Sequence, residues 1–330
     1  MRWVITPLIL VATALGLLTS HGALARAEPV RVAGQDYARV SDWARANGLE
    51  VRWLKRDETL QLSGRGAKVV LTVDSREAQF NGLSVWLSFP VIERSGVPCL
   101  SQAEMQATFL PLLTPPKNRA GVRLKTICLD PGHGGRDPGL CVGSKQEKKY
   151  TLLLAQELGA QLRKAGWKVC FTRSSDRYVD LPERPELAGS QHADLFISLH
   201  FNATENSAAS VHGTQVFCLT PPGARSTNAQ GEGADTSACT GNRNNDRNLF
   251  LAYQVQKALV QNLSLEDRGV RRARFAVLRD ATMPAVLVEA AFMSHPVEGR
   301  KIFTAAYRRQ LAQAIAAGVA AYQRQVTPGA

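Results

Sequence analysis

Short apolar runs alternate with longer amphipathic segments through the second half of the chain. Apolar runs of strand length lie at 126–129, 167–172, 194–199, 214–219, 275–278 and 285–288. Apolar residues at helical spacing occupy 150–165, 181–193, 247–263 and 302–323. The order strand, helix, strand, helix, strand is that of a doubly wound sheet. The pattern therefore predicts an α/β domain at 123–326, with a mostly parallel sheet and flanking helices.

The preceding part of the chain follows a different pattern. A short helix is predicted at 40–47, which Gly48 is placed to end, and strands are predicted at 59–62 and 68–73. Leu49–Trp53 alternates apolar and polar residues, as a half-buried strand does. Asn81-Gly82 predicts a tight hairpin turn. These features predict a small α+β domain at 28–113, and the proline-broken segment 114–122 predicts a linker.

The first residues have the pattern of a secretory signal peptide. Arg2 provides a positive start, 4–18 is apolar, and small residues at 23–27 offer cleavage sites. We therefore expect residues 1–27 to be removed and the protein to be exported to the periplasm or to the cell wall and extracellular space. An uncleaved membrane anchor is the alternative, although the apolar run is short for a span of about 20 residues.

Polar side chains stand close to the ends of the predicted strands. His133 follows the strand at 126–129 in a glycine-rich turn, and Glu147 lies at the start of the next predicted helix. His200 and Glu289 end the strands at 194–199 and 285–288. Because ligands collect at the carboxyl edge of an open α/β sheet, we expect these four side chains to converge there. An imidazole and a carboxylate so placed are candidate metal ligands, which indicates metal-assisted hydrolysis.

The same residues belong to motifs that resemble a known family. DPGHGGRDPG (130–139), Glu147 before a helix, SLHFNA (198–203) and VLVEAAFMSH (286–295) resemble the zinc-dependent N-acetylmuramoyl-L-alanine amidases of the Amidase 3 type. The motifs occur in the family's order, over about 125–325. The resemblance implies one zinc ion held by His133, Glu147 and His200, with Glu289 as the catalytic carboxylate. It further implies peptidoglycan as substrate, cleaved between N-acetylmuramic acid and L-alanine.

Other interpretations stay open at this point. Two histidines and one carboxylate suit a zinc carboxypeptidase or endopeptidase equally well, and a wall-binding protein with a degenerate zinc site is a third alternative. Each residue also has a structural interpretation. His133 could cap the glycine turn, and Glu147 could interact favourably with the N-terminal end of the helix dipole. His200 could be a core histidine, and Glu289 could pair with an arginine.

Several nearby polar residues have structural interpretations. Asp130 and Asp137 are expected to fix the glycine-rich loop, and Arg173 and Arg184 to be ion-pair partners, a substrate role remaining open. We expect three further histidines to lie at the surface or next to the site without a direct role: His192, His212 and His295.

The N-terminal segment is similar to the copper amine oxidase N-terminal-like domain. The similarity depends on the early helix, the Val51-x-Trp53 strand and the Asn81-Gly82 hairpin. It implies a non-catalytic module that associates with the wall or positions the enzyme, and it does not imply a copper site.

Charge and cysteine content refine this picture. A formal charge of +12 and a pI near 9.7 favour binding to polyanions. For an exported protein, the polyanions it meets are anionic polymers of the cell envelope. No nucleic-acid module is recognisable, and whether an activator protein binds stays an open question.

The six cysteines include no CxxC pair. Cys218 and Cys239, which bracket a polar loop, are the expected disulfide, whereas Cys128 and Cys170 are expected to be buried in strands. The loop at 220–245 is expected to lie on the surface, without an inhibitory helix.

Overall fold

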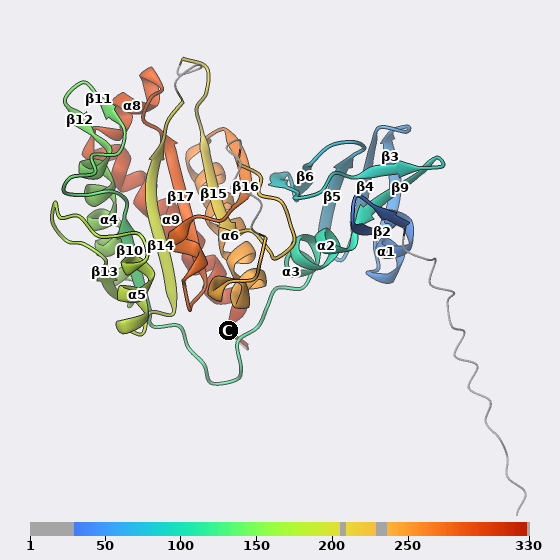
Figure 1. The fold of residues 1–330 in the computed structure, drawn as a ribbon, viewed down its shortest axis with the longest axis horizontal. Helices are drawn as coiled ribbons and strands as arrows, with labels where there is room; N and C mark the ends of the chain where they lie inside the picture. The colour runs from blue at the N-terminus through green and yellow to red at the C-terminus, as the bar shows by residue number, and fades with distance from the viewer. Residues whose placement is uncertain (1–29, 205–208, 229–235, 329–330) are drawn as a thin grey trace, which may run out of the picture.

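The computed structural model describes residues 30–204, 209–228 and 236–328, and the predicted signal peptide lies outside them. Strands from the N-terminal part (residues 30–113) and from the C-terminal part (residues 126–326) join in one 11-stranded sheet (Figure 1). Its order is β13-β10-β14-β17-β15-β16-β7-β6-β5-β4-β3. Within the described ranges, no helix has the length and apolar character needed to cross a bilayer.

The C-terminal part is doubly wound, as the sequence predicts. Its strands are β10 (Thr126–Pro131), β13 (Lys168–Phe171), β14 (Leu195–Asn202), β15 (Thr214–Leu219), β16 (Asp267–Ala273) and β17 (Ala285–Phe292). Neighbouring strands are parallel, except that β15 runs antiparallel to β17. A separate two-stranded hairpin, β11 (Cys141–Val142) and β12 (Lys145–Gln146), lies between β10 and the first helix.

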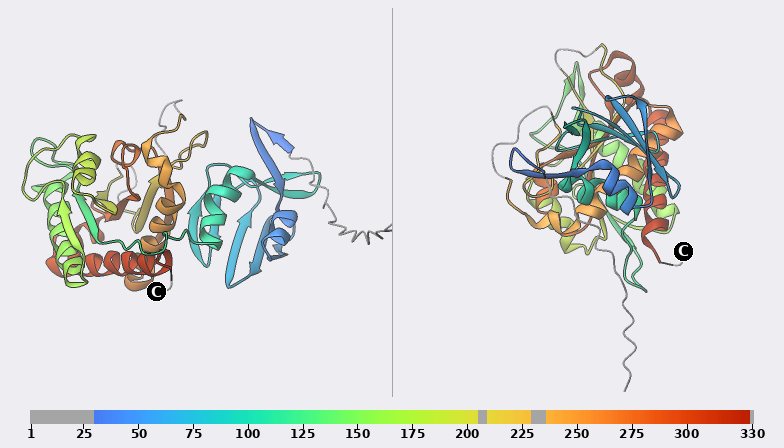
Figure 2. Two further views of the ribbon diagram at one scale, coloured as in Figure 1. Left: turned by 90° about the horizontal axis from the view of Figure 1, so that it is seen from below. Right: turned by 90° about the vertical axis from the view of Figure 1, so that its right-hand side faces the viewer.

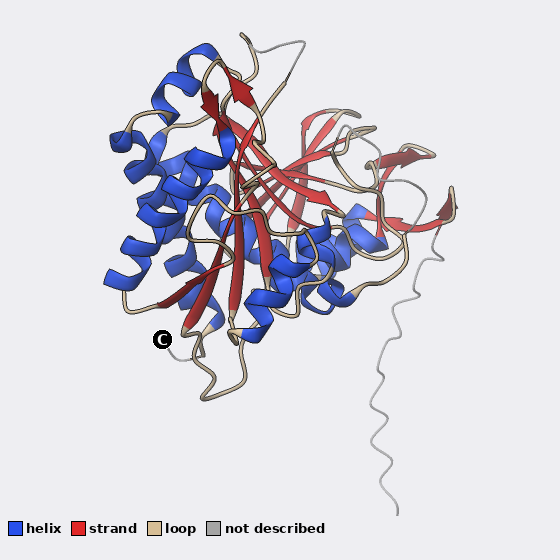
Figure 3. Ribbon diagram, turned by 60° about the vertical axis from the view of Figure 1, so that its left-hand side comes forward, coloured by secondary structure: helices blue, strands red, loops and turns tan. Residues whose placement is uncertain are grey.

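Helices lie against both faces of this sheet (Figure 3). The helices and helical turns are α4 (Glu147–Lys164), α5 (Glu183–Ser190), η2 (Thr240–Asn244), α6 (Asn245–Leu263), α7 (Ala276–Arg279), α8 (Pro296–Ile302) and α9 (Ala305–Val326). The large core cluster joins α4, α6 and α9 to residues such as Ile197, Val216 and Val288. A smaller cluster on the opposite face joins α5 and α7 to Phe196, Phe217 and Leu287.

The N-terminal part is built from antiparallel hairpins. Its elements are β1 (Val30–Val32), β2 (Gln35–Arg39), α1 (Val40–Ala46), β3 (Glu50–Lys55), β4 (Thr59–Gly64), β5 (Ala67–Thr72), β6 (Glu77–Phe80), β7 (Leu83–Trp86), β8 (Ile92–Arg94), β9 (Val97–Ser101), α2 (Gln102–Glu104), η1 (Met105–Phe109) and α3 (Leu110–Leu113). A 4-stranded sheet has the order β1-β2-β9-β8. The predicted Asn81-Gly82 turn joins β6 to β7, with φ of 51° and 80° at the two residues.

The two parts meet along β7 and β16, which pair in parallel at Val85 and Val270. Figure 2 shows the N-terminal part extending to one side of the C-terminal part. Across the junction, the guanidinium of Arg272 lies 3.3 Å from Oε2 of Glu104, and both side chains are almost fully buried. Arg272 also donates to the carbonyl of Ala107 and to the hydroxyl of Thr108, at 2.8 Å each. A continuous sheet and a buried ion pair therefore join the two parts.

Several predicted elements differ from the structure. The predicted strand at 275–278 is wrong: the chain forms α7 there, and the ring of Phe275 packs against Phe217 at 5.1 Å. The helix predicted at 302–323 is confirmed as α9, except that it begins at Ala305, where Thr304 caps it, and Ile302 is the last residue of α8. The strand predicted as half-buried at Leu49–Trp53 is β3, and all 6 of its residues are exposed because it is the last strand of the sheet.

The loop at 220–245 is packed more closely than expected. Among its described residues, Ala224 is buried with Tyr37, Phe89 and Cys99 of the N-terminal part. Ser226 accepts a hydrogen bond from Arg76 at its carbonyl, 2.9 Å away. Ala224 and Ser226 therefore belong to the junction, whereas residues 236–238 of the loop are exposed, as predicted. Its described residues include only the short η2 turn, and residues 229–235 of the expected surface loop lie outside the described ranges.

The predicted Cys218–Cys239 disulfide is wrong, since both residues are free thiols. Cys218 points into the large core cluster, whereas Cys239 packs against the smaller cluster on the opposite face of the sheet. Cys128 and Cys170 stand opposite each other on β10 and β13. Cys128 is buried as predicted, whereas Cys170 is only half-buried because β13 is the last strand at that side of the sheet.

Candidate metal centre

His133 lies on the turn that follows β10. Its backbone φ is 62°, and Gly134 and Gly135 also have positive φ, so the chain reverses sharply here. Nδ1 of His133 lies 2.8 Å from Oδ2 of Asp137. In the neutral imidazole this contact favours the ring proton on Nδ1, so that Nε2, which faces Glu147, can bind a metal. Asp137 therefore fixes the loop, as predicted, and also orients the imidazole.

Glu147 is the first residue of α4 and is almost fully buried. Its Oε2 accepts a hydrogen bond from the amide of Leu140 at 3.0 Å, and its Oε1 accepts one from the amide of Phe201 at 3.0 Å. Oε2 lies 3.1 Å from Nε2 of His133, and Oε1 lies 3.2 Å from Nδ1 of His200. The carboxylate thus stands between the two imidazoles.

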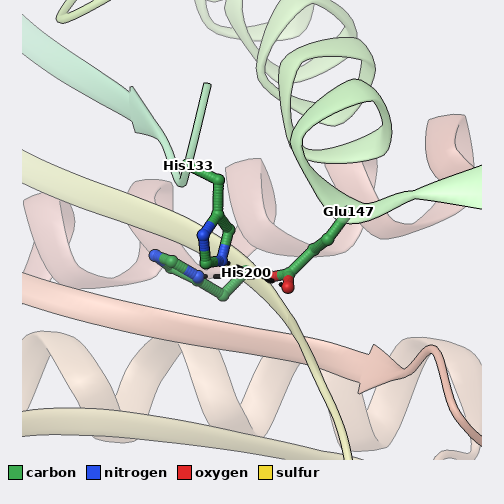
Figure 4. Close-up of side chains that lie close together, drawn as sticks. All are labelled: His133, Glu147 and His200. Atoms are coloured by element: carbon green, nitrogen blue, oxygen red, sulfur yellow. Dashed lines mark hydrogen bonds and ion pairs between the residues drawn. The ribbon is translucent and has the colours of Figure 1, made fainter. Parts of the chain in front are cut away.

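Figure 4 shows the three side chains converging from a loop, a helix and a strand. The rings of His133 and His200 are 4.9 Å apart and nearly perpendicular. Two glycines make room for them: a Cβ at Gly132 would lie 2.2 Å from the His200 ring, and one at Gly139 would lie 2.7 Å from Glu147 and His133. The close approach of backbone to ligands requires glycine at both positions.

Buried charges hold the loop that carries His133. Nη1 of Arg184 lies 2.8 Å from Oδ1 of Asp130, and neither side chain is more than 2% exposed. Arg184 also donates to the carbonyls of Pro131 and His133, at 3.0 Å each. The interpretation of Arg184 as an ion-pair partner is confirmed, and Asp130 fixes the loop as predicted.

Arg173 has a different role from the one predicted. Its guanidinium donates to the carbonyls of Pro131, Gly132 and Lys148, at 2.7–2.9 Å. Within the described ranges no carboxylate pairs with it, so its interpretation as an ion-pair partner is wrong. Arg173 satisfies backbone oxygens at the turn and at the start of α4, which ties the His133 loop to the helix that carries Glu147.

Glu289 lies beside His200, directly opposite it on β17. Both residues lie inside their strands rather than after them, because β14 extends to Asn202 and β17 to Phe292. Oε2 of Glu289 is buried and has no hydrogen-bond partner among the described residues. Burial raises the pKa of Glu289 to about 7; the charge of Glu147 adds to this effect, and His200 and His133 oppose it. No arginine pairs with Glu289 in the described part of the chain.

His133 and Glu147 have strongly shifted pKa values. Burial alone would lower the pKa of His133, but its hydrogen bonds to Glu147 and Asp137 and their charges raise it to about 9. Burial would raise the pKa of Glu147, but hydrogen bonds to His133 and His200 and their charges hold it well below its usual range. The group therefore favours a carboxylate with positive charge around it.

The donor set fits a zinc ion. Candidate ligand atoms of His133, Glu147 and His200 all lie within 4.8 Å of one another. Ligands about 2.0–2.1 Å from a tetrahedral ion lie about 3.3 Å apart. Each imidazole lies at a similar distance from its own oxygen of Glu147, 3.1 Å from Oε2 for His133 and 3.2 Å from Oε1 for His200. Three protein ligands leave one position of a tetrahedral ion open, as in catalytic sites.

The other histidines of the described residues, His192, His212 and His295, lie apart from this group. Nε2 of His212 lies 3.1 Å from a carboxylate oxygen of Glu266. His295 caps α8 by accepting a hydrogen bond from the amide of Glu298. His192 is exposed in the turn after α5. None of them belongs to the ligand group, as the sequence predicts.

The fold and this group define a doubly wound α/β domain with two histidines and one carboxylate, a candidate metal centre, gathered at the carboxyl edge of its sheet. Residues 127–321 match the N-acetylmuramoyl-L-alanine amidase family Amidase_3, and the chain belongs to that family. The N-terminal part lies outside the match.

Relatives and solved structures agree with this assignment. The chain is 36% identical over 230 residues to the amidase AmiC of Neisseria meningitidis, covering 63% of this chain and 55% of that protein. It is 34% identical over 233 residues to AmiA of Escherichia coli, covering 63% and 79%. The match thus spans about half the length of the Neisseria relative. Among solved structures, AmiC2 of Nostoc punctiforme has a TM-score of 0.51 at 30% identity, covering 61% of this chain and 97% of that chain.

Proposed function

We propose that this protein is a zinc-dependent peptidoglycan amidase that hydrolyses the bond between N-acetylmuramic acid and the L-alanine of the stem peptide. Family membership supports the reaction class. The observation that carries the proposal is the juxtaposition of the His133, Glu147 and His200 ligand group with Glu289. These three residues would hold the zinc ion, which would lower the pKa of a bound water toward about 7 and would polarise the scissile carbonyl.

Glu289 moves the protons in this proposal. Its carboxylate takes a proton from the attacking water and delivers it to the nitrogen of the departing L-alanine. Burial raises the pKa of Glu289 above its usual range in the metal-free protein, which makes its carboxylate a stronger base. The oxygen Oε2 has no competing hydrogen bond among the described residues, so it is free for the water.

The other residues hold the ligands in place. Asp137 keeps the lone pair of His133 Nε2 directed at the metal position, and the amides of Leu140 and Phe201 orient the carboxylate of Glu147. Arg184 and Arg173 hold the backbone carbonyls of the His133 loop. Little of the arrangement has to move before reaction, which favours catalysis.

The product distinguishes this proposal from a zinc carboxypeptidase or endopeptidase. Digestion of purified peptidoglycan should release the intact stem peptide with a free L-alanine amino group, detected by mass spectrometry. A shortened stem peptide would assign the protein to the alternative class instead. A chelator should abolish release in either case, and added zinc should restore it.

Glu289→Gln tests the role of the catalytic carboxylate. The variant keeps the size of the side chain, so it should bind zinc with the affinity of the unchanged protein and lose about 10²-fold or more of its turnover. Zinc content is measured by atomic emission and turnover by release of stem peptide. Full residual activity would contradict the assigned role.

We further propose that the protein acts outside the cytoplasm, with residues 30–113 as a wall-associated module. The signal-peptide pattern of residues 1–27 supports export, and the charge of +12 supports contact with anionic envelope polymers. The continuous sheet and the buried Glu104–Arg272 pair support a module at a fixed position relative to the metal centre. Cosedimentation of the Glu289→Gln protein with purified cell walls, at low and high salt, tests this contact.

A further inference from the structure

Gln215 continues a row of polar side chains across adjacent strands. Glu289 stands directly opposite His200 on one side and directly opposite Gln215 on the other. Residues opposite each other on neighbouring strands project from the same face, with Cβ atoms about 5 Å apart. The face is the one that carries the smaller core cluster, because Phe217 and Leu287 are two residues away from Gln215 and Glu289. Gln215 therefore lies next to Glu289, on the side away from His200.

The amide of Gln215 has no partner within the described ranges. The residue is only 7% exposed, yet neither amide atom takes part in a hydrogen bond with another described residue. The amide atoms are also not among the fully buried polar atoms, so the small exposed part of the residue includes its polar end. A nearly buried amide without hydrogen bonds costs free energy unless something else satisfies it.

Another glutamine at the same strand shows the contrast. Gln256 of α6 approaches β15 from the opposite face and is fully buried. Its Nε2 donates to the carbonyl of Thr214 and to Oδ1 of Asp267, at 2.9 and 2.7 Å. That side chain holds the fold together. Gln215 has no such bonds, although an apolar residue there would continue the run Val216–Leu219.

We propose that Gln215 is a substrate-binding residue whose side-chain amide pairs with a backbone amide of the stem peptide. A glutamine amide offers both a donor and an acceptor, and so matches the N–H and C=O of a peptide group. The peptide would then leave the reaction centre over Glu289 toward β15, while the sugar lies on the other side of the metal. This inference is an extension of the proposed amidase function.

The affinity for a soluble muropeptide in an inactive background tests the role of Gln215. In a Glu289→Gln protein, adding Gln215→Met removes the amide at nearly constant volume. Loss of a neutral hydrogen bond should weaken binding about three- to tenfold. Binding is measured by titration calorimetry with a disaccharide-peptide that carries an intact stem. Zinc content and Tm should equal those of the parent, since the Gln215 side chain makes no hydrogen bond to any described residue, the candidate metal ligands included.

A matched control is Gln61→Met in the same background. Gln61 is also nearly buried, at 6% exposure, but it lies in the N-terminal part and bonds to Ser63. Its replacement should leave the muropeptide affinity unchanged. Gln215→Asn, which keeps the polar group but shortens its reach, should weaken binding in the same direction as Gln215→Met and serves if the methionine variant does not fold.

The outcomes separate the inference from the proposed function. An unchanged affinity in the Gln215 variants overturns the inference, as does a loss of affinity that follows a loss of zinc or of Tm. If the unchanged protein releases no intact stem peptide from peptidoglycan, the proposed amidase function fails. The affinity comparison still decides whether Gln215 contacts the muropeptide, because it does not depend on turnover.

Discussion

The two parts of the molecule share one sheet but place their loops differently. In the N-terminal part, hairpins connect antiparallel strands, so successive strands end at opposite edges of the sheet. In the C-terminal part, crossover connections bring β10 and β14 to one edge, together with β17. Only the second arrangement gathers side chains from distant segments, which explains why the ligand group belongs to the C-terminal part.

One buried ion pair lies within the C-terminal part, and a second joins the two parts. Arg184 and Asp130 lie 2.8 Å apart behind the His133 loop, and Arg272 and Glu104 lie 3.3 Å apart at the junction. The side chains are equally buried, and both arginines bond to backbone carbonyls. The two arginines differ in the segments whose carbonyls they bind. Arg184 holds the backbone of a ligand residue, whereas Arg272 holds only the junction.

The comparison predicts its largest effect at Arg184. Arg184→Met leaves Asp130 buried without its counter-charge, which should lower the free energy of unfolding by about 3–5 kcal/mol. It also frees the carbonyl of His133, so zinc affinity should fall by about 10- to 100-fold. Chemical denaturation measures stability, and competition with a chromogenic chelator measures affinity.

Arg272→Met is the matched variant for this prediction. Its stability loss should be of the same order, about 3–5 kcal/mol, because Glu104 is equally buried. Zinc affinity should remain within twofold of the unchanged protein, a bound of about 0.4 kcal/mol. Equal zinc affinities in the two variants would contradict the prediction, because the Arg184–Asp130 pair would then have no more effect on the zinc site than the Arg272–Glu104 pair.

A smaller effect is expected at Asp137, which touches His133 without contributing to the core. Asp137→Asn keeps the size of the side chain but removes the charge that orients the ring, so zinc affinity should fall about tenfold. Because Asp137 is part of the cause of the raised pKa of His133, the variant should also lower that pKa from about 9. NMR titration of the metal-free protein reports the pKa, and chelator competition reports the affinity.

Local patterns in the sequence account for most of the C-terminal part. Apolar runs define β10, β14 and β17, and short motifs place His133, His200 and Glu289 beside them. The convergence of these residues follows from the shared edge of parallel strands, so the sequence could predict it. The α7 turn at Phe275 could not be predicted in this way, because a short apolar run suits a strand or a buried helix equally.

Long-range pairing accounts for what the sequence does not reveal. Nothing local to β7 or β16 indicates that they pair, so the sequence predicts two domains and the linker 114–122 but not the sheet that the two parts share. The exposure of β3 depends on its being the last strand, which alternation within Leu49–Trp53 cannot show. Cys218 and Cys239 bracket a loop, but the sheet separates their side chains. All three features depend on the tertiary arrangement of the strands, which the local pattern of apolar and polar residues does not contain.

The smallest effect is expected at the free edge of the sheet, in β3. Val51, Trp53 and Leu54 are 38–48% exposed there, although their residue types are those of a core. If nothing covers this edge in solution, Trp53→Ser removes little buried area and should change the free energy of unfolding by less than about 0.5 kcal/mol. Chemical denaturation of the two proteins at equal concentration measures the difference. A loss above about 1.5 kcal/mol, or one that grows with protein concentration, would mean that the edge is covered by another copy of the chain. The N-terminal part would then offer an assembly surface, in contrast to the C-terminal part, where the polar groups are gathered around the metal centre.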